Sequence, residues 1–217
     1  HFVNEHLIEM QTVDGARQQL TAKTIVVATG SRPRNPKEIP VDHEHILDSD
    51  SLLSMMYLPQ SLMVIGGGVI GCEYASTFAL LGVQVTLIDR APYPLQFMDR
   101  ELVEQFVQGL EHNGGRYLGG CQIAEVRWDN VAHVVTTLQD GTVIKSEKML
   151  VALGRQANIE DLALSAADIT VSDKGLIPIN QYCQTNIDHI YAVGDMASGP
   201  ALASKATGFP IAKLAAL

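Results

Sequence analysis

The sequence contains few cysteines. Only three of its 217 residues are of this type, Cys72, Cys121 and Cys183. They are scattered and odd in number, and no two sit at the spacing of a metal-ligand or redox motif, which argues against a disulfide-built domain. We therefore predict no metal site, and we expect free thiols in the reducing environment of the cytoplasm.

Positive charge is also scarce. Fifteen Lys and Arg stand against 24 Asp and Glu, giving a formal net charge of −9, which argues against nucleic acid or an anionic membrane as a partner. No apolar run approaches the length of a membrane-spanning helix, and no secretory leader pattern occurs. With 47% hydrophobic and 18% charged residues, the composition is that of one large or two small compact domains.

A glycine-rich turn is the most informative feature that is present. Gly66-Gly67-Gly68-Val69-Ile70-Gly71 follows the apolar run 62–65 and opens a helix-patterned segment, and a second apolar run, 83–88, ends on Asp89. This order of strand, turn, helix, strand and acid is typical of a dinucleotide-binding unit.

Each part of that pattern has a physical task. Gly66 permits the tight turn, Gly68 has no Cβ to block a pyrophosphate, and Gly71 lets the helix pack on the sheet. The helix amino terminus favours the phosphate charge, and Asp89 can accept hydrogen bonds from ribose hydroxyls. The sequence therefore predicts a site for a nicotinamide dinucleotide. We expect it to favour NAD(H), because Asp89 would repel a 2′-phosphate, although Arg90 could rotate to meet that phosphate.

Around the turn, the pattern from 62 to 153 predicts one self-contained unit. A crossover helix follows Gly71, and a second helix begins near Asp99. The remaining expected elements are a three-stranded meander over 121–128, 131–138 and 143–144, and a buried strand over 149–153.

The flanking segments are less regular. Residues 20–28 predict a return strand that follows a turn at Asp14-Gly15. The segment 32–40 contains three prolines and predicts a connector, after which Asp50 is expected to cap a short helix over 51–56.

Three segments share one design, a buried strand that stops at a small-residue turn: 25–30, 150–155 and 190–195. The first two segments, taken alone, are also typical of strand ends that have no role in binding. The third delivers Gly194 and Asp195 to a sheet edge, where an exposed carboxylate can hold a sugar-alcohol hydroxyl. We therefore expect Asp195 to contact a ligand.

These residues resemble a known family. The matching segments are Ala28-Thr29-Gly30-Ser31, Gly66 to Gly71, Ala152-Leu153-Gly154-Arg155 with Asn158, and Thr185 through Asp195. Together they are similar to the two-dinucleotide flavoprotein disulfide reductases, the pyridine nucleotide-disulfide oxidoreductases. The resemblance spans essentially the whole chain.

The resemblance implies an α/β fold in which a Rossmann-like, three-layer ββα NAD(P)-binding domain is inserted in a split FAD-binding domain. The implied parts are 1–58, the end of the first FAD-domain half with a linker; 59–155, the NAD(P)-binding domain; and 156–217, the return segment of the FAD domain. FAD, together with NAD or NADP, is the implied cofactor set.

Site residues follow from the same resemblance. The residues implied to bind NAD(P) are Gly66, Gly68, Val69, Ile70, Gly71, Asp89, Arg90 and Gly154. Those implied to bind FAD are Thr29, Gly30, Gly194, Asp195, Leu202 and Ala203. Glu73 matches a glutamate that pairs with a flavin-side lysine and is the implied catalytic residue, whereas Val69 replaces a tyrosine that covers the nicotinamide pocket in some relatives.

The implied activity is an FAD-dependent hydride transfer from NAD(P)H through the flavin to a second nicotinamide. Segments 48–55, 68–76 and 201–204 are most similar to the soluble transhydrogenases, and Ser204 stands where the lipoamide-reducing members carry histidine. Disulfide reduction of the dihydrolipoamide dehydrogenase type is the alternative within the family. An isolated NAD(H)-binding module without turnover is the alternative from another class.

The resemblance also implies that this chain is a piece of a longer protein. The family's first FAD fingerprint and its cysteine segment would precede His1, and its dimer domain would follow Leu217. We therefore expect the intact protein to be a homodimer or a higher homo-oligomer, and the piece alone to be inactive.

Overall fold

A computed structural model describes residues 1–199 of the chain, which form two compact units. The central unit comprises Pro33–Arg155, and the flanking unit comprises His1–Arg32 together with the segment that starts at Gln156. The strands β5 (Ser31–Pro33) and β14 (Arg155–Ala157), through which the chain passes from one unit to the other, pair with each other. No helix within the described residues is long and apolar enough to cross a membrane.

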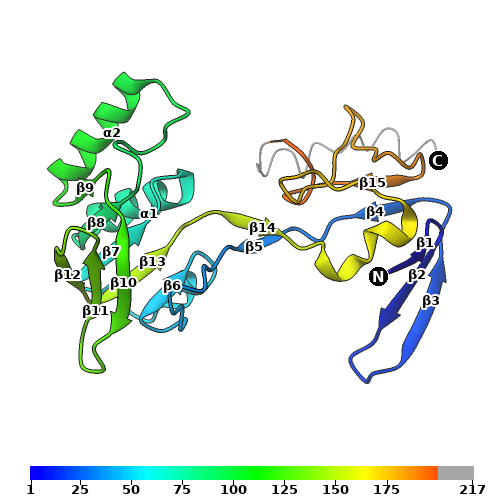
Figure 1. The fold of residues 1–217 in the computed structure, drawn as a ribbon, viewed down its shortest axis with the longest axis horizontal. Coiled ribbons are helices and arrows are strands. Elements are labelled where there is room, and N and C mark those ends of the chain that lie inside the picture. Colours follow the sequence, from blue (N-terminus) through cyan, green and yellow to red (C-terminus); the bar gives the residue numbers. More distant parts are fainter. Residues whose placement is uncertain (200–217) are drawn as a thin grey trace. The chain divides into compact units, whose positions relative to one another are not determined.

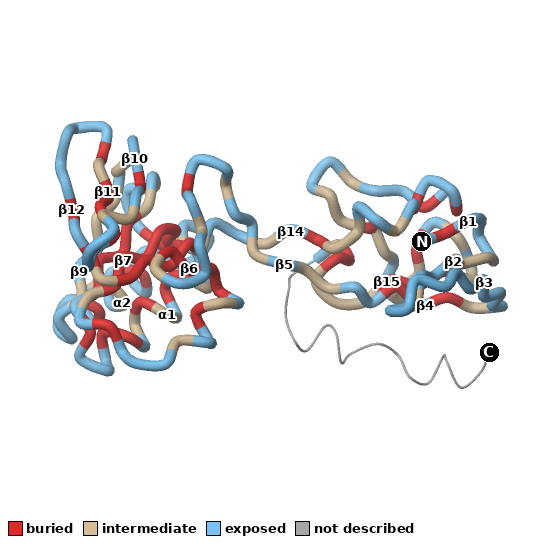
Figure 2. The backbone as a smooth tube through the Cα atoms, turned by 90° about the horizontal axis from the view of Figure 1, so that it is seen from below, coloured by how far each residue is buried: buried red, intermediate tan, exposed pale blue. Residues whose placement is uncertain are grey.

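The central unit is built on a five-stranded sheet in the order β6-β13-β7-β8-β9, with every pair parallel. Its strands are β6 (Ile46–Asp48), β7 (Ser61–Ile65), β8 (Gln84–Ile88), β9 (Arg116–Leu118) and β13 (Lys148–Val151). β7 and β13 are interior strands and are buried almost throughout, and Figure 2 shows the burial of β7. A strand covered on both faces requires a nearly continuous apolar sequence, which is what both strands have.

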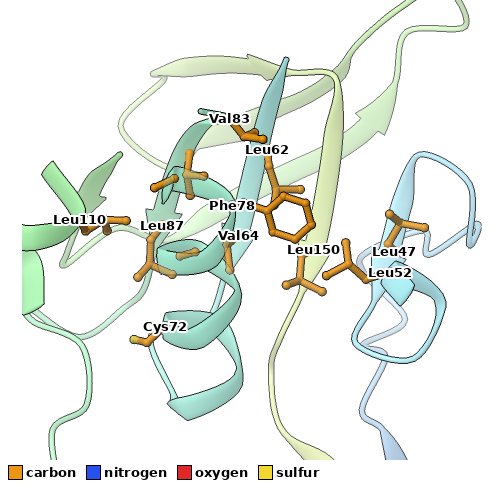
Figure 3. Close-up of a cluster of buried hydrophobic side chains, with 13 residues drawn as sticks. Leu47, Leu52, Leu62, Val64, Cys72, Phe78, Val83, Leu87, Leu110 and Leu150 are labelled. Carbon is orange, nitrogen blue, oxygen red and sulfur yellow. The ribbon is translucent and has the colours of Figure 1, made fainter. Parts of the chain in front are cut away.

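Helices cover one face of this sheet. α1 (Val69–Leu80) links β7 to β8, and α2 (Arg100–His112) links β8 to β9. Alternate strand residues such as Leu62 and Val64 point to this face and pack against Phe78. Figure 3 shows side chains of α1 and of the strands gathered in this cluster.

An antiparallel meander covers the opposite face. It consists of β10 (Ile123–Trp128), β11 (Val134–Leu138) and β12 (Val143–Ser146). The remaining strand residues, among them Met63 and Ile65, pack against Val134 and Leu138 from the meander. The meander, the sheet and the helices form three layers, so the predicted α/β ββα architecture is confirmed (Figure 1).

Within residues 1–199, the flanking unit contains two small sheets. β1 (Phe2–Asn4), β2 (Leu7–Gln11) and β3 (Arg17–Thr21) are antiparallel neighbours, and β4 (Ile25–Val27) pairs in parallel with β15 (Ile190–Ala192). Two short 3₁₀ helices, η2 (Glu160–Leu162) and η3 (Leu164–Ala167), follow β14. Ile177, Ile190 and Met196 are fully buried in the core of this unit.

Three local predictions were wrong. The single return strand over 20–28 is two strands, β3 and β4, in different sheets. The expected strand over 131–138 begins only at Val134, because the Asp129 carboxylate accepts hydrogen bonds from three successive N–H groups and holds 131–133 in a turn. The expected helix over 51–56 is the 3₁₀ helix η1 (Ser51–Ser54).

The cap of η1 also differs from the prediction. Asp50 makes no side-chain capping hydrogen bond, whereas Oδ1 of Asp48 accepts from the backbone N–H of Ser51 at 2.8 Å. Asp48 is only 4% exposed. Burial acts to raise its pKa, but hydrogen bonds from Asn35 and Ser51 outweigh burial and bring the pKa to about 2.

Candidate functional site

The glycine turn is tightly packed at two of its three positions. Gly66 has φ of +110°, and a Cβ there would lie 2.4 Å from the carbonyl oxygen of Ala152. At Gly71 a Cβ would lie 1.9 Å from the carbonyl oxygen of Gly66. Both positions therefore exclude any side chain, because real Cβ atoms do not approach backbone this closely.

Gly68 is different. It is the residue that precedes α1, it has an extended backbone with φ of −80°, and no protein atom lies within 4 Å of its Cβ position. The open space stands at the amino terminus of a twelve-residue helix, where partial positive charge accumulates. Packing within the fold therefore does not require glycine at position 68, and the open space there is compatible with an approaching phosphate.

Asp89 follows β8 and binds the turn directly. Its Oδ2 accepts a hydrogen bond from the N–H of Gly67 at 2.5 Å, and its Oδ1 accepts from the N–H of Ala91 at 2.8 Å. An ionised carboxylate has about four acceptor positions, so two backbone bonds leave room for ribose hydroxyls. Asp89 therefore fixes the turn and still has acceptor positions that residues 1–199 do not use.

A cavity of about 530 Å³ opens beside Gly66 and Asp89. It lies along the carboxyl ends of β7 and β8, which is where open α/β sheets bind their ligands. Apolar side chains such as Ile39 and Ile123 line it together with Arg90. Its other charged lining residues are Arg34, Glu38 and Glu125.

A second cavity, of about 1000 Å³, runs along α1 and contains the predicted residues Val69, Ile70 and Glu73. Val69 is half exposed. Glu73 is exposed and forms no ion pair with any of residues 1–199. Gly154 has φ of +96° and open space at its Cβ position.

Cys72, one turn into α1, is not a reactive thiol. Burial, with smaller effects from the charges of Asp89 and Glu73, raises its pKa to about 12. Its Sγ donates to the carbonyl oxygen of Gly67 at 3.5 Å. Because the thiolate is the nucleophile, Cys72 contributes packing and not redox chemistry.

Gly30, Gly194 and Asp195, which were predicted to bind FAD, lie in the flanking unit. The parallel strands β4 and β15 end side by side, and the N–H of Val193 donates to the carbonyl of Val27 at 3.0 Å. Gly30 and Gly194 follow these strands with φ of +67° and +86°, and both have open space at the Cβ position. Asp195 therefore lies at the edge where β15 ends, and the parallel pairing brings Gly30 to the same edge.

Ser31 joins this group although it was not predicted as a site residue. Its hydroxyl donates to Oδ2 of Asp195 at 2.7 Å, across 164 positions of the sequence. Asn158 stabilises the turn that contains Thr29 and Gly30, since its side-chain amide donates to the carbonyl of Thr29 at 3.0 Å. The strand-end pattern could have indicated Ser31, because it directly follows Thr29 and Gly30. The predicted Leu202 and Ala203 lie outside the described residues.

The parallel sheet, its glycine turn and the covering meander define an α/β protein with the architecture of the flavoprotein disulfide reductases. Residues 2–208 match the family described as pyridine nucleotide-disulphide oxidoreductase, and the chain belongs to that family.

Curated relatives agree with this assignment. The chain is 39% identical over 205 residues to the soluble pyridine nucleotide transhydrogenase of Colwellia psychrerythraea, covering 94% of the chain and 44% of that protein. It is also 39% identical over 218 residues to that of Mycobacterium tuberculosis, covering 99% and 46%. The chain thus spans about half the length of the curated relatives that it matches.

Solved structures show the same fold. LpdA from Mycobacterium tuberculosis aligns with a TM-score of 0.88 at 28% identity, covering 97% of this chain and 46% of that one. A Cu(II) complex of a mutant of RclA, a HOCl-induced flavoprotein disulfide reductase from Escherichia coli, aligns with a TM-score of 0.91 at 24% identity, covering 100% and 49%. At 24% identity the second likeness concerns the fold alone.

Proposed function

We propose that this chain is part of an FAD-dependent pyridine nucleotide oxidoreductase that transfers hydride between NAD(P)H and FAD and on to a second nicotinamide. Membership in the family and 39% identity to soluble transhydrogenases support this activity. In this proposal residues 59–155 form the NAD(P)-binding domain. Residues 1–58 and 156–217 contribute to the FAD-binding domain.

One observation carries the nicotinamide half of the proposal. Gly68 is the only glycine of the three fingerprint positions whose missing side chain leaves open space, and it stands at the amino terminus of α1. A dinucleotide pyrophosphate fits there because it needs both close backbone approach and positive potential. The adenosine then extends toward Asp89 and Arg90, the nicotinamide extends toward Val69 and Ile70, and Gly154 lies near the middle of the cofactor.

The flanking unit provides acceptors that fit part of FAD. The Asp195 carboxylate and the neighbouring Ser31 hydroxyl lie at the ends of β4 and β15, and the bare Gly30 and Gly194 allow a ligand to approach the backbone. We assign Asp195 to the ribityl hydroxyls of FAD and Thr29 and Gly30 to the lining of the same cofactor. When bound, FAD supplies the group that accepts and returns the hydride.

The chain's own residues orient and bind the cofactors. Gly66 and Gly71 hold the turn against α1, so the pyrophosphate position is fixed before binding. Glu73 lies on the exposed side of α1 beside the second cavity. We assign it to an ion pair with a lysine on the flavin side.

The remaining parts of the proposal concern the whole protein. We propose a homodimer or higher homo-oligomer in the cytoplasm, with nicotinamide dinucleotides as its small-molecule partners.

A disulfide reductase is the second candidate, because RclA, which in one of its structures aligns at 25% identity with a TM-score of 0.88, is named a flavoprotein disulfide reductase. Such an enzyme needs a cysteine pair. Cys72, Cys121 and Cys183 are all free thiols in the described chain, so this candidate requires cysteines elsewhere in the protein.

Two measurements test the proposal. The 217-residue chain should bind NADH, and the full-length protein should reduce an NAD⁺ analogue at the expense of NADPH. Reduction of lipoamide by NADH without nicotinamide exchange would favour the disulfide reductase. If the full-length protein binds NADH but contains no flavin and shows no turnover, it is an NAD(H)-binding module and not an enzyme.

A further inference from the structure

Arg34 lies in the segment 32–40, which the prolines predict to be a connector, yet hydrogen bonds anchor this segment to the central unit. The N–H of Arg34 donates to the carbonyl of Gly154 at 3.0 Å. The next residue, Asn35, donates from its amide to the buried carboxylate of Asp48 at 2.9 Å. Two prolines flank this stretch and restrict its backbone further. Arg34 is therefore held at one place in the central unit.

The place is next to the glycine turn. Arg34 lines the 530 Å³ cavity together with Gly66 and Leu153. Gly66 contacts Ala152, since a Cβ at Gly66 would lie 2.4 Å from the Ala152 carbonyl oxygen. Residues 152–154 thus connect the backbone of Arg34 to the turn that faces the pyrophosphate.

The guanidinium of Arg34 is exposed and forms no salt bridge or side-chain hydrogen bond with residues 1–199. The other cations near the turn are placed differently. Arg155 is bonded to Ser49 and Asp50 at 3.1 and 3.0 Å. Arg90 lines the cavity directly after Asp89, where the proposed function places the adenosine.

The cavity requires such a cation if it is to hold a doubly charged pyrophosphate. Three carboxylates, those of Glu38, Asp89 and Glu125, line it against two guanidinium groups, and the chain carries a formal charge of −9. The amino terminus of α1 contributes only about half a positive charge. Planar guanidinium groups bind phosphate oxygens in pairs and keep their charge at every working pH.

We propose that Arg34 binds the pyrophosphate of the dinucleotide from the 530 Å³ cavity beside Gly66, as a binding residue common to NAD and NADP. This inference rests on the proposed function and names a further residue of the same site. Because the pyrophosphate is shared by both cofactors, Arg34 sets affinity, whereas Asp89 and Arg90 set the choice between them.

The test compares Arg34→Gln with Lys37→Gln in the 217-residue chain. Lys37 is a matched control, because it is exposed in the same segment and does not line the cavity. Binding of NADH, NADPH, ADP-ribose and adenosine is measured by equilibrium titration. Arg34→Gln should weaken the first three ligands alike, by about 10- to 100-fold, because a charge-assisted hydrogen bond is lost. Adenosine, which has no phosphate, should bind as before.

Three outcomes would overturn the proposal. They are an unchanged affinity in Arg34→Gln, a loss that affects adenosine equally, and a loss confined to NADPH, which would place Arg34 at the 2′-phosphate. If Arg34→Gln does not fold, Arg34→Lys is tested instead, because lysine keeps the positive charge but lacks the paired N–H donors of a guanidinium. Its affinity for ADP-ribose should then fall less than about 10-fold.

The proposed function is tested separately by the wild-type chain. If wild type binds NADH and Gly68→Ala does not, the proposed nicotinamide site is supported independently of the result for Arg34. If wild type binds no dinucleotide, the site and the role of Arg34 are both wrong.

Discussion

The α-carbon of Gly71 packs against the carbonyl oxygen of Gly66, so closely that a Cβ at Gly71 would lie 1.9 Å from that oxygen. This contact joins the first turn of α1 to the end of β7. It draws the amino terminus of the helix up to the glycine turn, and the open position at Gly68 lies between the two. Packing therefore requires glycine at positions 66 and 71 but not at position 68.

Gly71→Ala should destabilise the fold. The new methyl group has to displace backbone rather than a flexible side chain, so we expect the free energy of unfolding to fall by about 1–3 kcal/mol or more. Urea denaturation, monitored by circular dichroism, measures this free energy of unfolding. Gly109→Ala is the control, because Gly109 lies in α2, is exposed and has no atom near its Cβ position. There, alanine should raise stability by about 0.5–1 kcal/mol, and a similar gain at Gly71 would refute the close contact.

Gly68→Ala should leave the stability of the fold unchanged and weaken the binding of NADH. No protein atom opposes the methyl group and the backbone needs no positive φ, so the unfolding midpoint should stay close to that of wild type. The methyl group would occupy the approach of the pyrophosphate, and we expect NADH affinity to fall at least about 10-fold, or 1.4 kcal/mol. Fluorescence titration with NADH measures this. Undiminished affinity would show that the pyrophosphate lies elsewhere.

Asp89 should make the chain prefer NADH to NADPH. Its carboxylate can bond ribose hydroxyls but repels a 2′-phosphate, and two like charges at about 4 Å cost roughly 4 kcal/mol at an effective dielectric near 20 before screening. Arg90, in the same cavity, offsets part of this repulsion. Titration with both cofactors should give the lower dissociation constant for NADH, and Arg90→Gln should widen the gap. Equal affinities for the two cofactors would contradict this role of Asp89.

The parts of the site that depend on neighbouring residues could be predicted from the sequence. The turn from Gly66 to Gly71, the acid after β8 and the start of α2 at Asp99 all follow local rules of spacing and capping. Asp99 accepts from the N–H of Glu101 at 3.0 Å, as a capping residue does.

Contacts between distant segments could not be predicted in this way. The hydrogen bond from Ser31 to Asp195 and the anchoring of Arg34 to Gly154 depend on which strands end side by side. Even the local cap of η1 was assigned to the wrong aspartate, because Asp48 and Asp50 are equally good capping residues until burial distinguishes them. Tertiary packing decides such cases.

Asp48 links the segment that contains Arg34 to the start of η1, and its charge should stabilise the central unit. Its carboxylate is buried and accepts hydrogen bonds from the side chain of Asn35 and from Ser51. Burial opposes the charged form, but these bonds outweigh it, and the pKa falls from 3.8 to about 2. A group whose pKa is lowered on folding stabilises the fold above its unfolded pKa, and this contribution is lost as the pH falls through its folded pKa.

We therefore expect Asp48→Asn to lower the free energy of unfolding at neutral pH by roughly 2 kcal/mol, from the size of the pKa shift. The difference between wild type and variant should persist down to about pH 4 and then shrink toward about pH 2, as Asp48 takes up a proton. Denaturation at a series of pH values measures this, and comparing the two proteins cancels the titration of other carboxyl groups. Glu111→Gln, a change at an exposed position of α2, should show no such pH-dependent difference. A constant difference for Asp48→Asn from pH 7 to 2 would mean that the carboxylate stabilises η1 by its shape rather than by its charge.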